Sequence, residues 1–556
     1  MMKPKPAFIS SLTLSVFMCW TSLILFPPMP VIGNIPPATL SHTAPSGQTI
    51  LVLDNVITGR SAAVLRSYLM KFSRWKLLDS TPESTVQPSL QHLDFPWTAK
   101  ISATFIENNC FWKNIASLPR LKNLLPYDVQ ADILRRGDSV KVQRGLDKLD
   151  TEQYSWRVFL TPDVQINDYG DLTFYERNEH NPSEIAEAVL TVSPRVGRLV
   201  LWDSSLASLY HPPSMGYLQG VLSIAGKLTT RKDKHSEYEQ KLQEELDEMQ
   251  HISQTSFPGQ FTLSEEALDL ANKCIRSFHD NSGRTIAVYD NIFSAVDLAH
   301  LHDVLAVQGE IMYHPHDVQR EEDVDNAQWI QQLDPDKFTK SAVWKRLSQV
   351  MRHASGNRTS WYPYDVALNI VRSADHTRIH QDCDEWEDEY TMVLYLNPDW
   401  QPEFYGETVF FEATPGSELS RQLYGPNGET EYQPIASVLP KYGRLVVFQG
   451  IIPHSARPPS SLFTGARYTF AVKVSLTRRI SLAKRLQETL EDCFDELSSK
   501  KQQLLQDLIS GNFNHGPSFR SNHWLEQTLQ ETVREATKVR QKSKTQMERI
   551  LFTACD

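Results

Sequence analysis

The chain has 556 residues, of which 40% are hydrophobic and 22% charged, so it can form several domains and is not a disordered or fibrous polymer. Its formal net charge of −11 argues against a general nucleic-acid binder, because contact with phosphates needs clustered Lys and Arg. Six cysteines are too few for a disulfide-built scaffold of this length, and the lack of a Cys-x-x-Cys pair argues against a structural zinc site.

The chain begins with an apolar segment that is followed by proline-rich sequence. Ala7–Phe26 is 20 residues long and uncharged, about the length that crosses a bilayer as a helix. Lys3 and Lys5 precede it, and positive residues tend to stay on the cytosolic side. We therefore predict a membrane anchor, with the rest of the chain on the luminal side of the endoplasmic reticulum or Golgi. A cleaved signal peptide, and hence secretion, is the alternative, and a buried core helix is a third.

Several blocks of the sequence recur about 236 residues later, in the same order. Gln48–Asn55 reads QTILVLDN, and Arg284–Asn291 reads RTIAVYDN. Tyr154–Arg177 and Tyr390–Ala413 share 9 of 24 aligned positions. Two shorter blocks repeat as well, at Pro126–Val129 and Pro363–Val366 and at Gly197–Trp202 and Gly443–Phe448. A repeat that keeps its order and spacing predicts a duplicated domain.

Each copy contains helical patterns followed by short strand patterns. Ser61–Phe72 in the first copy and Ala295–Val307 in the second copy have helical periodicity. The predicted strands of the second copy are β-branched and aromatic runs between Pro, Gly and Asn turns: Thr391–Leu396, Thr408–Phe411, Leu445–Phe448 and Tyr468–Val474. This spacing is typical of an antiparallel sandwich or jelly roll, so the predicted fold class is α+β.

Helices are also predicted between the copies and after the second one. Arg231–Gln250 is a charged segment of good helix formers that would link the two copies. Ser481–Leu508 and Trp524–Arg549 are predicted to form two helices at the C-terminal end. They would either pack on the second copy or form a dimerising coiled coil.

A glycosylation sequon and the number of cysteines are two further features of the sequence. Asn357–Thr359 is an N-glycosylation sequon, which is compatible with export. The cysteines outside the apolar segment are odd in number, so at least one is not paired within the chain: Cys110, Cys274, Cys383, Cys493 and Cys555.

The second copy contains a set of residues suited to bind a metal. His380 and Asp382 precede its main strand block, and His454 follows the last shared block. Two imidazoles and one carboxylate form the facial triad of non-haem Fe(II) oxygenases, which leaves metal positions open. Residues i and i+2 of an extended segment point to the same side, so His380 and Asp382 can reach one metal. The spacing alone is not specific, because His92–Asp94 has the same pattern without a comparable context.

With its context, the triad resembles a known family. The region from Arg284 to Leu476 is similar to the 2-oxoglutarate and Fe(II)-dependent oxygenase superfamily, in its prolyl 4-hydroxylase-like branch. The resemblance implies a double-stranded β-helix, or jelly-roll, domain in which His380, Asp382 and His454 bind Fe(II). Gly406–Thr408 matches the turn that enters a central strand of this family.

The resemblance also implies residues that bind the cosubstrate. Arg467 matches the basic residue that binds the distal carboxylate of 2-oxoglutarate, a task that suits the two-pronged guanidinium. Thr469 lies two positions later and would face the same carboxylate. The chain departs from the branch in three ways. Collagen-type enzymes have a Lys in place of Arg467, and Thr377 and Val371 stand where tyrosines often bind the cosubstrate.

The implied activity is a dioxygenase reaction with Fe(II), 2-oxoglutarate, O2 and, as in related enzymes, ascorbate. It would hydroxylate a prolyl or lysyl side chain of a protein or peptide and release succinate and CO2. An acidic run, Asp384–Glu389, follows Asp382 and suggests a basic substrate, although a solvated loop explains it as well. One alternative is a non-catalytic jelly-roll binding or scaffold protein of the secretory pathway. Another is a metal hydrolase, which is disfavoured because the sequence shows no evident general base.

The first copy lacks the residues of the site. In the repeat alignment, Gln143, Gly145 and Ser208 replace the triad, and Val221 replaces Arg467. A fold that is kept without these ligands suggests packing, homodimerisation or substrate docking. The predicted organisation is a signal anchor or signal peptide (1–33), a proline-rich stem (34–47), a degenerate oxygenase-like domain (48–228), a helical linker (229–283), a catalytic oxygenase domain (284–476) and a helical tail (477–556).

Overall fold

The computed structural model describes most of the chain from residue 40 onward. The described residues are 40–45, 47–77, 96–117, 121–138, 143, 152–162, 164–177, 185–217, 220–255, 263, 268–307, 312–314, 328–356, 360–373, 375, 379–383, 389–413, 432–463, 465–491, 499–509 and 522–553. Several features predicted above lie outside them, namely Ala7–Phe26, residues 34–39 of the stem, His92–Asp94, the sequon, Gly145, Thr377, residues 384–388, Cys493 and Cys555. Among the helices that are described, none is both long and apolar enough to cross a membrane.

The first half of the chain forms two antiparallel sheets. The larger sheet has eight strands in the order β1 (Leu40–Thr43), β2 (Thr49–Leu53), β9 (Leu199–Asp203), β6 (Glu152–Phe159), β11 (Val221–Thr229), β5 (Leu125–Leu134), β4 (Trp97–Lys100) and β3 (Lys76–Leu77). The smaller sheet has three strands in the order β10 (Ala207–Tyr210), β7 (Leu172–Arg177) and β8 (Ile185–Val192).

The second half repeats this arrangement strand for strand. Its larger sheet has the order β12 (Cys274–His279), β13 (Thr285–Tyr289), β20 (Leu445–Gln449), β17 (Glu389–Tyr395), β22 (Ala466–Ser475), β16 (Tyr362–Arg372), β15 (Gln328–Gln332) and β14 (Met312–His314). Its smaller sheet has the order β21 (His454–Ala456), β18 (Thr408–Ala413) and β19 (Tyr432–Val438). The four predicted strands fall on β17, β18, β20 and β22, and the mixed fold with antiparallel sheets is compatible with a jelly roll.

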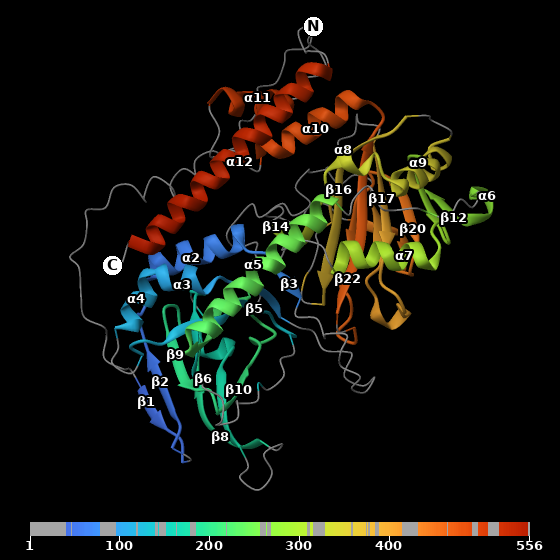
Figure 1. Cartoon of the computed structure of the whole chain (residues 1–556). Helices are drawn as coiled ribbons and strands as arrows, with labels where there is room; N and C mark the ends of the chain where they lie inside the picture. The colour runs from blue at the N-terminus through green and yellow to red at the C-terminus, as the bar shows by residue number, and fades with distance from the viewer. Residues whose placement is uncertain are drawn as a thin grey trace, which may run out of the picture.

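Helices cover the larger sheets (Figure 1). Those of the first half are α2 (Gly59–Phe72), α3 (Ala103–Asn108) and α4 (Cys110–Ala116), and those of the second half are α7 (Ala295–His302), α8 (Pro335–Phe338) and α9 (Ala342–Ala354). The short helix α6 (Leu270–Lys273) precedes the edge strand β12. Helix α2 begins before the predicted Ser61, because the Thr58 side chain accepts a hydrogen bond from the Ser61 amide and caps the helix. Its buried residues Ala62, Leu65 and Leu69 recur at helical spacing and face the core.

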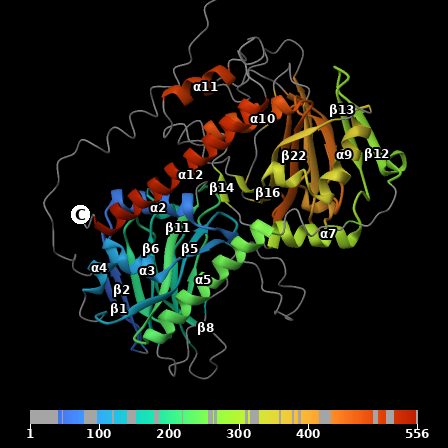
Figure 2. The same ribbon diagram turned by 45° about the horizontal axis from the view of Figure 1, so that its top comes forward.

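Helix α5 (Lys232–Thr255) is the predicted charged linker, but it packs on the first half. The Tyr238 hydroxyl donates to the carbonyl oxygens of Ile101 (2.9 Å) and Val129 (2.8 Å), and Leu242 is buried. The helix runs from the first half toward the second in both ribbon views (Figure 2). The linker therefore belongs to the packed structure.

The C-terminal end forms three helices, α10 (Arg478–Glu491), α11 (Ser499–Ile509) and α12 (Asn522–Thr553). The sequence predicts one helix where the structure has α10 and α11. The predicted packing of this end on the second copy is incomplete, because α12 also contacts α2 of the first half. Helix α12 contacts α10 and extends along the first half, where Glu548 accepts a 2.9 Å hydrogen bond from the Tyr68 hydroxyl. Arg540 also donates to the Lys71 carbonyl oxygen, so this helix connects the two halves.

The two halves share one hydrophobic core, in which a tryptophan of each half meets the other. Trp97 of β4 and Trp329 of β15 stack with ring centroids 4.0 Å apart and planes 16° apart. Trp97 is opposite Ile133 in its sheet, and Trp329 is opposite Ile370 in the other. The stack therefore joins equivalent positions of the two halves, as in the symmetric interface of a two-fold dimer.

Candidate metal centre

Backbone pairing brings the first two residues of the triad to the third. The His380 amide donates to the His454 carbonyl oxygen, and the His454 amide donates to that of His380, both at 2.9 Å. The Asp382 amide donates to the Gly450 carbonyl oxygen at 2.8 Å. The segment that carries His380 and Asp382 therefore lies alongside β21, with both side chains on one side of it.

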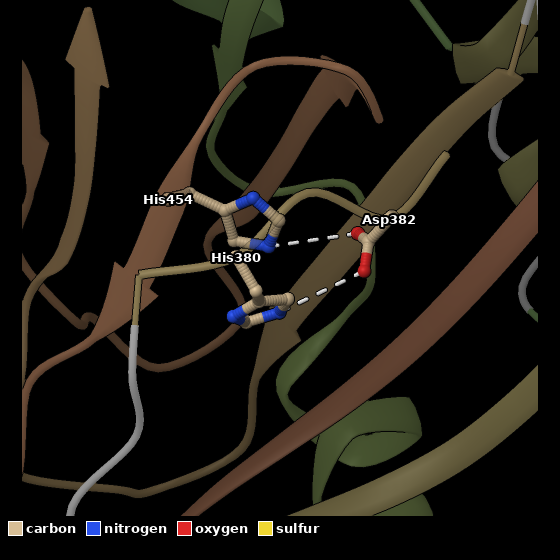
Figure 3. A group of neighbouring side chains, drawn as sticks. All are labelled: His380, Asp382 and His454. Carbon is tan, nitrogen blue, oxygen red and sulfur yellow. Dashed lines mark ion pairs between the residues drawn. The ribbon is translucent and has the colours of Figure 1, made fainter. Parts of the chain in front are cut away.

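The three side chains converge (Figure 3). His380 Nε2 lies 3.7 Å from Asp382 Oδ1, and His454 Nε2 lies 3.5 Å from Asp382 Oδ2. One ligand atom from each residue lies within 4.8 Å of the others. Within the described part of the chain, no other cluster of three or more His, Cys, Asp or Glu has a geometry that could hold a metal.

The environment of His454 prepares it to act as a ligand. Its Nδ1 lies 3.0 Å from the Ile452 carbonyl oxygen, so Nδ1 carries the proton and Nε2 faces Asp382 with its lone pair. Burial and the nearby His380 lower the pKa of His454 to about 4. The imidazole is therefore neutral at ordinary pH, as metal binding requires.

Asp382 is held by two groups besides the imidazoles. The Thr391 hydroxyl donates to Asp382 Oδ2 at 2.5 Å, and Lys473 Nζ lies 3.3 Å from Asp382 Oδ1. Lys473 also lies 3.1 Å from Asp365. Burial alone would raise the pKa of Asp382, but Lys473 and the two histidines outweigh it and hold that pKa below its usual value. Two imidazoles and an ionised carboxylate fit Fe(II).

We expect Thr391→Val to weaken Fe(II) binding by about tenfold, because the hydroxyl orients the carboxylate ligand. Anaerobic equilibrium titration with Fe(II) measures this effect. Thr173→Val is the control, since Thr173 is a buried threonine of the first half that pairs with Thr191. Equal Fe(II) affinity in Thr391→Val and the wild type would contradict the assigned role.

Arg467 lies in a second buried cluster of the same half. Its side chain is 1% exposed, and Nη2 donates to the Thr408 hydroxyl at 3.0 Å. The Tyr395 hydroxyl donates to the same Thr408 oxygen at 2.7 Å, and the guanidinium carbon lies 5.2 Å from the centre of the Tyr395 ring. Arg467 Nε is buried and has no hydrogen-bond partner among the described residues. A buried guanidinium with a donor left over suits a carboxylate ligand.

Strand β22 connects the Arg467 cluster with the triad. Arg467, Thr469 and Lys473 occupy alternate positions of this strand and so share one face. Thr469 is buried and lies opposite Tyr395 in the sheet, and Val371 lies opposite Arg467. The structure thus places Arg467 and Thr469 on the strand face whose other end, at Lys473, contacts Asp382.

Sequence reasoning missed three residues around these groups, Thr391, Tyr395 and Lys473, and named Thr408 only as part of the turn Gly406–Thr408. Strand alternation could have indicated Thr391 and Tyr395, which are four residues apart on β17. One prediction needs correction. Glu389, counted in the acidic run, is buried and accepts a hydrogen bond from Tyr364, so it cannot attract a substrate from solvent.

The corresponding place in the first half holds a different set of groups. Gln143 and Ser208 form a backbone bridge like that of His380 and His454. In the same interior, Arg157 donates to Asp132 at 2.9 Å and to the Ser223 hydroxyl at 2.5 Å. Asp132, Gln143, Arg157 and Ser208 are among the residues that line a cavity of about 40 Å³. A buried ion pair therefore fills the first-half interior.

The structure gives the bonding state of three cysteines. Cys110 is disulfide-bonded, and its partner lies outside the described residues. Cys274 and Cys383 are not in disulfides, in agreement with the expectation that at least one cysteine is not paired.

Comparison with known proteins identifies the region that holds the triad. Residues 366–474 match the family model described as 2OG-Fe(II) oxygenase superfamily. No curated protein matches the chain.

The solved structures that match the chain are distant from it. An oxidoreductase of the 2OG-Fe(II) oxygenase family from Burkholderia pseudomallei has 16% identity and a TM-score of 0.26 over 39% of this chain and 95% of its own. A Pseudomonas putida prolyl-4-hydroxylase has 17% identity and a TM-score of 0.23 over 34% and 91%. A Trichoplax adhaerens prolyl hydroxylase in complex with a peptide fragment of the hypoxia inducible factor oxygen degradation domain has 14% identity and a TM-score of 0.24 over 42% and 92%. The family of this region therefore rests on the sequence match of residues 366–474.

Proposed function

Because residues 366–474 form a 2OG-Fe(II) oxygenase superfamily domain, we propose that the chain is an Fe(II)- and 2-oxoglutarate-dependent dioxygenase that hydroxylates a protein or peptide side chain. The observation that carries this proposal is the convergence of His380, Asp382 and His454 beside a strand whose buried Arg467 has a donor left over. A non-catalytic binding module has no need of both groups.

In the proposed mechanism, the imidazoles of His380 and His454 and the carboxylate of Asp382 would hold Fe(II). With 2-oxoglutarate and O2, bound Fe(II) supplies an oxidative decarboxylation that yields succinate and CO2 and delivers one oxygen atom to a C–H bond of the substrate. Thr391 and Lys473 hold the Asp382 carboxylate in place. The burial of His454 and Asp382 keeps bulk water from their ligand atoms.

Arg467 would bind the distal carboxylate of 2-oxoglutarate, and Thr469 on the same strand face would add a hydroxyl. Thr408 and the Tyr395 ring orient the guanidinium before the ligand arrives. Because Arg467 is buried, the attraction between the two charges would be stronger than in water. The charge of 2-oxoglutarate would in turn compensate the buried guanidinium.

The substrate belongs to the proposal as well. The prolyl 4-hydroxylase-like resemblance favours a prolyl or lysyl residue in a peptide, with ascorbate as reductant. A basic peptide is favoured by Asp384, Glu385, Glu387 and Asp388 beside the site in sequence, without the buried Glu389.

The compartment is proposed on similar grounds. The apolar segment Ala7–Phe26 favours a membrane-anchored protein on the luminal side of the endoplasmic reticulum or Golgi, or a secreted one. The disulfide of Cys110 supports an oxidising compartment.

We propose that the first half is a duplicated domain that has lost its metal site. Its strand order equals that of the second half, and Arg157 and Asp132 occupy its interior. The binding-module alternative describes this half well. For the whole chain, a homodimer or a scaffold role would follow from that alternative.

The experiment that tests the proposed function uses the full chain with Fe(II), ascorbate and 2-oxoglutarate. Succinate formation is measured with and without proline- and lysine-containing peptides, both basic and acidic. We expect iron-dependent succinate that a basic peptide stimulates. No succinate above a metal-free control, with every peptide, would favour the non-catalytic alternative.

A further inference from the structure

Two buried ion pairs connect the first half of the chain with the second. Arg135 of the first half pairs with Asp375 of the second, and Arg372 of the second half pairs with Asp138 of the first. Asp138, Arg372 and Asp375 are each no more than 3% exposed. The Arg135 guanidinium also lies over the ring of Trp329, 5.7 Å from its centre. These four charged residues, which we call the cross-half ion pairs, therefore lie beside the tryptophan stack.

The cross-half ion pairs are equivalent to each other. Arg135 and Arg372 are 237 positions apart, and so are Asp138 and Asp375. In each half the arginine amide donates to the aspartate of its own half, at 2.8 Å in the first and 2.9 Å in the second. Each aspartate thus accepts from the backbone of its own half and from the guanidinium of the other. This reciprocity makes the contact self-complementary, as in a two-fold dimer interface.

The cross-half ion pairs lie next to the metal ligands along the chain. Arg372 is the last residue of β16, Asp375 follows three positions later, and His380 follows after five more. The Asp375 amide donates to the Arg372 carbonyl oxygen at 3.0 Å, which closes a turn between them. His380 and Asp382 are attached to β21 and Gly450 at the other end. Arg135 and Asp138 therefore fix the point where the chain leaves the sheet toward the ligands.

Energetics favour a positional role for these pairs over a net gain in stability. Burying two charges carries a desolvation cost that can exceed their attraction, so apolar residues of similar size are often as stabilising as a buried pair. Removing one partner, in contrast, leaves a charge without compensation. What a buried pair adds is a single allowed arrangement, because each guanidinium must meet its carboxylate.

We propose that Arg135 and Asp138 of the first half are positioning residues for the metal centre of the second half. They set the exit of the segment that carries His380 and Asp382. This inference rests on the proposed function in so far as the centre binds Fe(II). It also explains why a half whose own interior is filled by Arg157 and Asp132 is retained: the catalytic half needs it as a partner.

The test compares three variants of the full chain with the wild type. Asp138→Asn and Arg135→Gln break one cross-half ion pair each, and Asp132→Asn breaks the buried Arg157 pair inside the first half. The first readout is hydrogen exchange of the His380 and Asp382 amides in metal-free protein, since both amides are hydrogen-bonded. The second readout is Fe(II) affinity by anaerobic titration.

We expect faster exchange of both amides and about tenfold weaker Fe(II) binding in Asp138→Asn and Arg135→Gln. Asp132→Asn should leave both readouts unchanged, even if it lowers the melting temperature as much. If Asp138→Asn does not fold, Arg135→Lys replaces it. This variant keeps the charge without the two-pronged guanidinium and should give a smaller effect in the same direction.

Unchanged exchange in both cross-half variants, or equal changes in Asp132→Asn, would overturn the inference whether or not Fe(II) binds. If exchange rises as expected but wild-type protein binds no Fe(II), the positioning of the segment stands and the proposed function fails. The two proposals can therefore fail separately.

Discussion

Replacement of Asp382 by alanine should weaken Fe(II) binding by at least about 100-fold and abolish succinate formation, because it removes the only anionic ligand of the triad. His380 and His454 would remain, but imidazole ligands supply no negative charge to balance that of the metal. The measurement is anaerobic Fe(II) titration of the purified variant, followed by a succinate assay.

Asp365→Asn is the matched control for Asp382→Ala. Both carboxylates lie near Lys473 Nζ, at 3.1 Å for Asp365 and 3.3 Å for Asp382, but only Asp382 faces the histidines. Asp365→Asn should therefore bind Fe(II) far better than Asp382→Ala. Equal losses in the two variants would show that Lys473, and not the triad, is what the assay detects.

Replacement of Arg467 by methionine should weaken 2-oxoglutarate binding by about 100-fold or more while Fe(II) affinity stays the same. Truncating one partner of a buried charge pair costs about 2–5 kcal/mol, and ten-fold in affinity corresponds to about 1.4 kcal/mol. Methionine fills much of the same space, so Tyr395 and Thr408 can keep their positions.

Arg467→Lys extends this experiment. The lysine keeps a positive charge in the buried cluster but loses the planar two-pronged donor, so its 2-oxoglutarate affinity should fall between wild type and Arg467→Met. The affinities are measured by equilibrium titration in the presence of Fe(II). Wild-type affinity in Arg467→Met would mean that another group binds the distal carboxylate.

The local sequence predicted much of the fold and of the triad. The strands of the second copy follow their β-branched and aromatic runs, as Leu445–Phe448 does in β20. Helix α2 follows its apolar spacing and gains its first turn from the Thr58 cap. His380 and Asp382 share a side because they are two positions apart in extended chain, which is a local property.

Contacts that depend on strand register could not be predicted from the sequence. Thr391 and Lys473 meet Asp382 because they lie opposite each other on β17 and β22, and no local pattern specifies that pairing. The sequence places Glu389 in an acidic run. In the structure, Glu389 begins β17 opposite Ser475 of β22, and this position buries its side chain. The Tyr364 hydroxyl donates a hydrogen bond to it, and Lys484 Nζ lies 4.0 Å from its carboxylate; both partners are distant in sequence.

The contacts between the two halves could not be predicted from the sequence either. The repeat shows that Arg135 corresponds to Arg372 and Asp138 to Asp375, but not that the two pairs cross between the halves. Helix α12 similarly reaches the first half through Glu548 and Tyr68, although its own amphipathic pattern names no partner.

The central claim is that the second half binds 2-oxoglutarate through Fe(II) at the triad and through Arg467. Anaerobic titration of the full chain with 2-oxoglutarate, with and without Fe(II), tests it most directly. The account predicts binding that requires Fe(II) and reaches one 2-oxoglutarate per chain, since the first half has Gln143 and Ser208 at the ligand positions. Equal binding without Fe(II), or no binding in its presence, would contradict the account.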